Sequence, residues 1–121
     1  METKDVAAKL VALCNAGQNM VAMDTLYAPD IVSIEAGDTS NPMSKVAGLD
    51  AVKGKGQWWY ENHEVHSGAT RGPWVNGDNF IVEHTYDITF KPTGVRRVMN
   101  ETALYEMRDG KIAKETFFYD A

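Results

Sequence analysis

Apolar residues recur at helical spacing in three stretches of the chain. The first covers residues 6–14, which contain no Pro or Gly, and Asn15-Ala16-Gly17 then favours a left-handed stop. The second covers residues 20–27 and is expected to end before Pro29, because the residue preceding a proline resists helical geometry. The third covers residues 49–62. The pattern therefore predicts three helices, of which the first two form a hairpin.

Alternating and β-branched segments predict five strands. A short strand covers residues 31–35, and the polar segment 37–42 follows it as a loop. The other four form a meander over residues 65–71, 79–90, 95–107 and 111–119. The sequences Asn-Gly, Pro-Thr-Gly and Asp-Gly lie between them and favour hairpin turns, because Asn, Asp and Gly accept a positive φ. The order ααβαββββ predicts a single α+β domain over residues 1–121, with the helices covering one face of a curved antiparallel sheet.

Strand alternation indicates which side chains of this sheet share a face. In the strand 79–90 the apolar set includes one imidazole and one phenol, and we expect this set to face inward. Its members are Phe80, Val82, His84, Tyr86, Ile88 and Phe90. The next two strands do not divide by polarity, so alternation alone leaves their inner face open.

Charge and cysteine content narrow the classes of function. Twelve Lys and Arg residues against 17 Asp and Glu residues give a formal charge of -5, and Arg96-Arg97 is the only adjacent basic pair, which argues against a nucleic-acid or membrane partner. No apolar run is long enough for a membrane helix, and the first residues lack a signal-peptide pattern, so a cytoplasmic protein is expected. The single cysteine, Cys14, lies on an apolar helix side and is interpreted as inert packing.

The third predicted helix contains unusual residues. Gly54 and Gly56 each cost it about 1 kcal/mol relative to Ala, which indicates a close backbone approach or a distortion. Trp59 and His63 fall on its inward stripe and are candidates for a pocket wall, whereas Trp58 and Tyr60 are expected to turn away. His63 and His66 have no third metal ligand nearby in sequence, so no metal site is predicted.

The element order and several short strings of residues resemble one family. These strings are Ala12-Leu13-Cys14-Asn15-Ala16-Gly17, Leu26-Tyr27-Ala28-Pro29-Asp30, Asp109-Gly110-Lys111-Ile112 and Phe118-Tyr119-Asp120. The chain resembles the SnoaL-like branch of the nuclear transport factor 2 superfamily, which includes polyketide cyclases, ketosteroid isomerases and non-catalytic binding modules. The resemblance implies a cone-shaped, half-open barrel whose mouth is closed by the helices, commonly in a homodimer.

Carried over by position, the resemblance gives a mixed picture. The general-base carboxylate of the ketosteroid isomerases falls on Glu35, whereas their two oxyanion-hole donors fall on Leu10 and Ala103, which cannot donate. The histidine and the acid/base aspartate of the SnoaL cyclases fall on Glu115 and Phe117. The resemblance also implies that six residues of the last two strands face the pocket. These are Glu101, Ala103, Tyr105, Glu115, Phe117 and Tyr119.

We therefore expect a cofactor-free enzyme of the cyclase, isomerase or dehydratase kind that acts on a small apolar or aromatic carbonyl compound. Glu35 is the first candidate for the base, Glu115 or Glu101 the second, and His84 or Tyr86 would polarise the developing enolate. The residues predicted to bind substrate are Tyr27, Trp59, His63, Tyr86, Ala103, Tyr105, Phe117 and Tyr119.

A second hypothesis is a small-molecule-binding or dimerisation module of the same fold without turnover, which the missing oxyanion donors favour. A homodimer is also predicted from four apolar residues expected on the outer face of the sheet. These are Val98, Leu104, Ile112 and Phe118.

Overall fold

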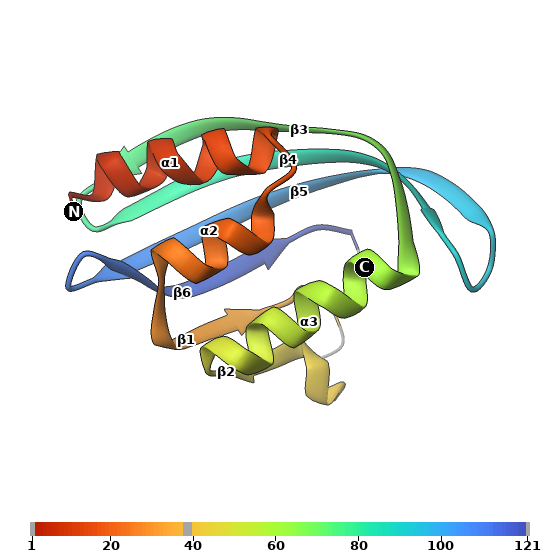
Figure 1. Ribbon diagram of the computed structural model, residues 1–121, viewed down its shortest axis with the longest axis horizontal. Coiled ribbons are helices and arrows are strands. Elements are labelled where there is room, and N and C mark those ends of the chain that lie inside the picture. The colour runs from red at the N-terminus through yellow and green to blue at the C-terminus, as the bar shows by residue number, and fades with distance from the viewer. Residues whose placement is uncertain (1, 38–39, 121) are drawn as a thin grey trace.

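Three helices pack on one face of a curved six-stranded sheet in the computed structural model, which describes residues 2–37 and 40–120 (Figure 1). The helices are α1 (Thr3–Asn15), α2 (Asn19–Leu26) and α3 (Leu49–Asn62), with a short 3-10 turn, η1 (Pro42–Ser44). The strands are β1 (Tyr27–Ile34), β2 (Lys45–Ala47), β3 (His63–Asn76), β4 (Asn79–Phe90), β5 (Val95–Arg108) and β6 (Lys111–Phe118). The predicted α+β class and the three covering helices are confirmed. None of the described helices is both long and apolar enough to cross a membrane.

The sheet is open and mixed, with the strand order β2-β1-β6-β5-β4-β3. All neighbouring strands are antiparallel except β1 and β6, which pair in parallel. The sequence analysis did not predict this parallel pair. The turns predicted between successive strands indicate only antiparallel neighbours, and no local sequence signal indicates that β6 pairs with the distant β1. The meander β3 to β6 itself has the predicted order.

The polar end of α1 attaches it to the sheet. The helix ends at Asn15, and Gly17 follows with a φ of 72°, as the Asn-Ala-Gly string predicts. The Asn15 side chain donates a hydrogen bond to the carbonyl of Thr70 (3.0 Å) and accepts one from the Thr70 backbone N–H (2.8 Å). Helix α1 therefore lies fixed alongside β3 (Figure 1).

Two segments near the first strand differ from the sequence prediction. Tyr27 was expected in the second helix, but it begins β1, and Pro29 lies inside that strand. Proline restricts the residue before it, here Ala28, to extended geometry, and in this structure the extended backbone begins one residue before that, at Tyr27. The predicted loop, residues 37–42, ends where η1 begins, and the Asn41 side chain accepts a hydrogen bond from the Met43 N–H there. The three-residue strand β2 follows η1 and is too short to leave a sequence pattern. Residues 38 and 39 of that loop lie outside the described residues.

A bulge in β6 reverses the direction of its side chains. Ile112 pairs with Met107 and Lys114 pairs with Glu106, so β6 contains one extra residue between them. Ile112 is therefore completely buried in the core, and its predicted place on the outer face is wrong. Of the other outer-face residues, Leu104 is half-buried, whereas Val98 and Phe118 are 61% and 54% exposed. The homodimer stays a prediction.

The two glycines of α3 have different surroundings. A Cβ atom on Gly56 would lie 3.1 Å from Cε of Met23, so the expected close approach is present there. Nothing lies within 4 Å of the corresponding point on Gly54.

We expect Gly54→Ala to raise the free energy of unfolding by about 0.5–1 kcal/mol, because it reduces the entropy of the unfolded chain without a steric cost. Gly56→Ala should give a smaller gain, because Met23 must move. Urea unfolding of both variants measures the difference, and a loss of stability in Gly54→Ala would contradict this assignment.

Candidate functional site

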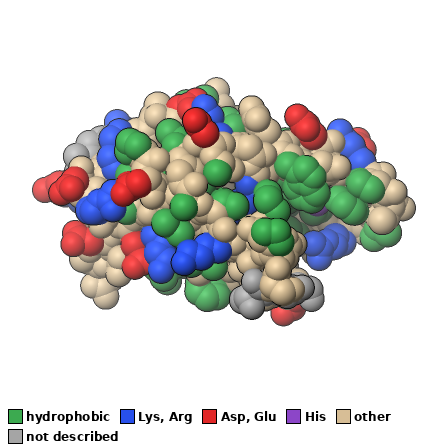
Figure 2. Space-filling model, turned by 90° about the horizontal axis from the view of Figure 1, so that it is seen from below, with side chains coloured by type: hydrophobic (Ala, Val, Ile, Leu, Met, Phe, Trp, Pro, Cys, Tyr) green, Lys and Arg blue, Asp and Glu red, His purple; other side chains and the backbone are tan. Residues whose placement is uncertain are grey.

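A cavity of about 640 Å³ lies between the helices and the concave face of the sheet. All three helices, β1 and the strands β4 to β6 contribute to its walls, which consist mostly of apolar and aromatic side chains. Most of the lining residues are buried or half-buried, whereas Met43 and Trp58 are exposed and lie at the open side. Figure 2 shows hydrophobic side chains gathered in one half of the face turned towards the viewer, with Lys and Arg side chains at their edges. A pocket of this size and lining is typical of a site for a small, largely apolar molecule.

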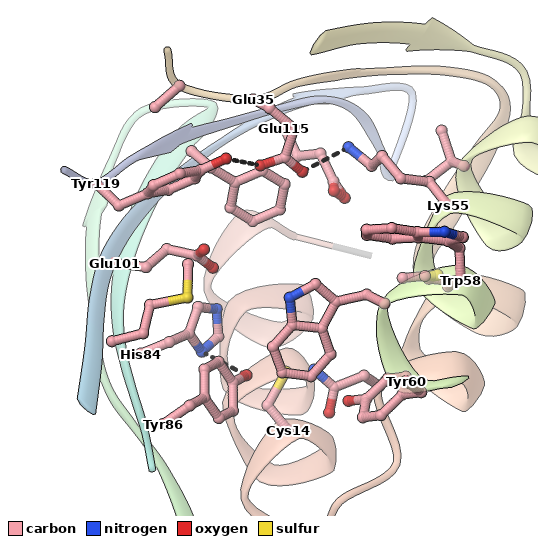
Figure 3. Close-up of a pocket in the computed structure, with 18 of the residues that line it drawn as sticks. Cys14, Glu35, Lys55, Trp58, Tyr60, His84, Tyr86, Glu101, Glu115 and Tyr119 are labelled. Atoms are coloured by element: carbon pink, nitrogen blue, oxygen red, sulfur yellow. Dashed lines mark hydrogen bonds and ion pairs between the residues drawn. The ribbon is translucent and has the colours of Figure 1, made fainter. Parts of the chain in front are cut away.

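Glu35 is held by two partners at one side of this cavity. It directly follows β1, and its carboxylate accepts hydrogen bonds from Lys55 Nζ (2.8 Å) and from the Tyr119 hydroxyl (2.7 Å) (Figure 3). These two partners bond to different oxygens of the carboxylate. Lys55 also donates to the hydroxyl of buried Ser33, and its Nζ lies 5.5 Å from the centre of the Phe117 ring. Glu35 is therefore an ion-paired carboxylate of fixed orientation.

Glu115 lies deeper, with a relative exposure of 1%. Its Oε1 accepts a hydrogen bond of 2.6 Å from the Tyr27 hydroxyl. Burial raises the pKa of Glu115 to about 7, while the Tyr27 bond, the charge of Lys55 and the Ser33 hydroxyl oppose that rise. Burial and the nearby Glu115 in turn raise the pKa of Tyr27 well above its usual value. Glu115 is thus a buried carboxyl group that titrates near neutrality.

Glu101 differs from the other two carboxyl groups because it has no partner among the described residues. Within residues 2–37 and 40–120 it forms no hydrogen bond and no ion pair, and Figure 3 shows its carboxyl group projecting into the cavity opposite Glu35 and Lys55. Burial first, and then repulsion from Glu35 and Glu115, raise the pKa of Glu101 to about 8, although Lys55 opposes the rise. At neutral pH Glu101 is therefore mainly a protonated acid.

His84 and Tyr86 are neighbours of Glu101 across the sheet, where His84 pairs with Glu101 in the β4–β5 register. The Nδ1 atom of His84 lies 2.8 Å from the Thr70 hydroxyl and 3.4 Å from the Tyr86 hydroxyl (Figure 3). Burial lowers the pKa of His84 to about 4 and raises that of Tyr86. Both groups are consequently neutral at pH 7 and act only as hydrogen-bonding groups.

The aromatic wall comes mainly from α3. Trp59 stacks on His63 with ring centres 4.4 Å apart, and His63 Nδ1 donates a hydrogen bond of 2.8 Å to the Trp59 carbonyl. Trp58 and Tyr60 also line the cavity, so the expectation that they turn away from it is wrong (Figure 3). The side chains of three consecutive residues spread over more than half of the circumference of a helix. The cavity is wide enough to be lined by all three, Trp58, Trp59 and Tyr60.

The remaining predicted site residues divide between cavity and core. Tyr105 and Phe117 line the cavity, and Tyr105 stacks on Phe80 behind it with ring centres 4.9 Å apart. Ala103 is completely buried in the core and is not among the residues that form the cavity wall. Leu10 lines the cavity without any polar atom to offer.

Lys55 is the main feature that sequence reasoning missed. It lies four residues before Trp59, which belongs to the predicted inward stripe of α3. This spacing was the available signal, because residues four apart lie on the same side of a helix. Cys14 lines the cavity as well, and burial raises its pKa to about 12, which leaves little thiolate.

Comparison with known proteins gives one family. A family model described as the SnoaL-like domain matches residues 1–119. A crystal structure from Mesorhizobium loti, provisionally named a SnoaL-like polyketide cyclase with carbohydrate phosphatase in brackets, is 42% identical, with a TM-score of 0.94 over 98% of this chain and 100% of its own. No curated protein sequence matches.

Two more distant crystal structures share the fold. One, from Jannaschia sp. CCS1, is provisionally named a SnoaL-like polyketide cyclase and is 16% identical, with a TM-score of 0.76 over 98% of this chain and 85% of its own. The other, from Catenulispora acidiphila, has a ketosteroid isomerase-like fold and is in complex with trimethylamine. It is 19% identical, with a TM-score of 0.73 over 98% of this chain and 88% of its own.

Proposed function

The chain belongs to the SnoaL-like domain family, and we propose that it is a cofactor-free enzyme that moves a proton next to the carbonyl group of a small, largely apolar compound. Isomerisation, ring closure and dehydration all begin with this step. The name of the Mesorhizobium loti relative supports the cyclase class among these reactions.

The observation that carries this proposal is the contrast between two carboxyl groups in one apolar cavity. Glu35 is ion-paired with Lys55, whereas Glu101 forms no hydrogen bond or ion pair with any described residue and has a pKa of about 8. Two carboxyl groups that are held in different protonation states at the same pH can act as a base and an acid at once. A binding pocket for an apolar molecule has no need of such a pair, because each buried carboxyl group costs desolvation free energy.

In the proposed reaction the carboxylate of Glu35 accepts the proton from the carbon next to the carbonyl. The protonated Glu101 donates a hydrogen bond to the carbonyl oxygen as negative charge develops there, which replaces the missing donors at Leu10 and Ala103. The resulting enolate, still hydrogen-bonded to Glu101, either takes the proton back from Glu35 at a second carbon, or attacks an electrophilic carbonyl carbon of the same molecule, after which Glu35 gives its proton to the new alkoxide oxygen. The aromatic wall holds the substrate away from water.

Glu115 is assigned a supporting role in this scheme. Its carboxyl group is bonded to Tyr27 and deeply buried, so it is less accessible to a substrate than Glu101. His84 would orient the substrate as a neutral hydrogen-bonding group.

Deuterium uptake from D₂O into acetophenone and larger aryl ketones, followed by NMR, tests the proposal. Glu35→Gln should slow the uptake at least tenfold, because general-base catalysis contributes roughly 10²–10⁴-fold. Glu106→Gln, on the same sheet but outside the cavity, is the matched control and should leave the rate unchanged. An uptake rate that is the same with Glu35→Gln as with the unmodified protein would reject Glu35 as the base.

A non-catalytic binding module is the second candidate function. Leu10 and Ala103 favour it. They occupy the positions of the oxyanion donors in the resembled isomerases, and both are buried, apolar side chains that cannot donate a hydrogen bond. Saturable binding of the same ketones without deuterium uptake would support this module. The exposed Val98 and Phe118 fit a homodimer in either case.

A further inference from the structure

The adjacent arginines at the start of β5 face opposite sides of the sheet. Arg96 donates two hydrogen bonds to the Asp87 carboxylate, at 3.0 and 2.9 Å, on the outer face. Arg97 has the same direction as Met99 and Glu101 and lines the cavity. Arg97 forms no hydrogen bond or ion pair with any residue that the structure describes. One arginine of the pair is thus neutralised, whereas the other offers its guanidinium group to the cavity.

Arg97 lies at the mouth of the cavity, whereas the carboxyl groups lie inside it. Its side chain is exposed, and the start of β5 belongs to the β4–β5 hairpin that extends past α3 in Figure 1. Four residues along a strand span roughly 13 Å, which separates Arg97 from Glu101 along β5. The cavity therefore has a cationic end and an acidic end.

The acidic end carries little net charge at neutral pH. Lys55 offsets Glu35, and burial favours the protonated forms of Glu101 and Glu115. Lys55 itself is occupied by Glu35 and Ser33, so it has little capacity left for a ligand. The cation that remains open to an incoming molecule among the described cavity residues is Arg97.

We propose that Arg97 is a specificity residue that binds a carboxylate group at one end of an elongated ligand, while the apolar carbonyl end extends towards Glu101. The planar guanidinium group matches a carboxylate through two parallel hydrogen bonds. The assignment of the carbonyl end rests on the proposed function, but the recognition of the carboxylate end does not require turnover. The substrate class is therefore an aryl or alkyl keto acid in which a chain separates the two groups.

Binding of matched probes tests this inference. Benzoylpropionate and the longer benzoylheptanoate are compared with their uncharged primary amides by titration of tryptophan fluorescence, since Trp58 and Trp59 line the cavity. We expect the longer carboxylate to bind at least tenfold more tightly than its amide. Arg97→Gln should abolish this difference, and Arg97→Lys should restore part of it. Arg96→Gln is the matched control and should keep the full difference.

Three outcomes would overturn the inference: equal affinity for carboxylate and amide, a preference that survives Arg97→Gln, or no binding of either carboxylate. Because the readout is affinity, it separates the two proposals. A carboxylate preference that depends on Arg97 in a protein without deuterium uptake would sustain Arg97 as the recognition residue and reject the proposed enzyme.

Discussion

Replacing Lys55 by methionine is expected to lower the free energy of unfolding by about 2–3 kcal/mol. The side chains of Lys55 and Glu35 are only 14% and 26% exposed, so removal of the ammonium group leaves a carboxylate in a poorly solvated place. The loss is smaller than the roughly 3–5 kcal/mol for fully buried pairs because Glu35 keeps some contact with water and its bond from Tyr119.

The same substitution should raise the pKa values of Glu101 and Glu115 further, because the charge of Lys55 lowers both in the unmodified protein. Carbon-13 NMR of the side-chain carboxyl groups across a pH titration measures this directly. A change in stability alone could come from lost packing, but a shift of two separate titrations in the same direction reports the loss of a charge.

Lys53→Met is the matched control for Lys55→Met. Lys53 lies on the same helix and pairs with Asp24, but the two side chains are 31% and 52% exposed. An ion pair of this kind contributes roughly 0–1 kcal/mol, so the control should change neither the stability nor the two titrations substantially. Equal losses in the two variants would show that the cavity gives Lys55 no special role.

The fold was largely predictable because its signals are local. Hairpin sequences and strand alternation set the β3 to β6 meander, and helical spacing gives α3 with both ends correct. The parallel pairing of β1 with β6 has no local signal, since it joins segments separated by most of the chain. The bulge that buries Ile112 is one extra residue in a strand of mixed polarity, which alternation alone cannot detect.

The sequence indicated which residues line the candidate site, but not which of them form hydrogen bonds and ion pairs with each other. The family resemblance implied that Glu101, Glu115 and Tyr119 face the pocket, and it added Glu35. The sequence could not indicate that Glu35, rather than Glu101 or Glu115, forms the ion pair, because the partner Lys55 comes from a helix whose inward side was defined by its apolar residues. Which carboxyl group is paired determines which one stays protonated, so the division of roles required the structure.

Stability should decrease as the pH rises from about 5 to about 8. Glu101 and Glu115 have pKa values of about 8 and about 7 in the folded protein, against 4.5 for an ordinary glutamate. The folded state therefore binds more protons than the unfolded state in this range, and stability that is present at pH 5 is lost as these groups ionise. His84 acts in the opposite direction below pH 6.5, because its pKa falls to about 4 on folding. Two carboxyl groups outweigh one imidazole, which leaves a net loss on the order of 1 kcal/mol per pH unit.

Glu115→Gln and Glu101→Gln should each make the protein more stable than the unmodified chain at pH 8, by on the order of 1–3 kcal/mol, and nearly equal to it at pH 5. A glutamine has the shape of the protonated acid and never ionises, and at position 115 its carbonyl can still accept the bond from Tyr27. Glu106→Gln, in an exposed pair with Lys114, should not alter the slope. Urea unfolding at several pH values measures these differences. If both cavity variants kept the full pH dependence, the raised pKa values of Glu101 and Glu115 would be excluded, and with them the acid role of Glu101, since an ionised carboxylate at that position would repel the developing negative charge instead of stabilising it.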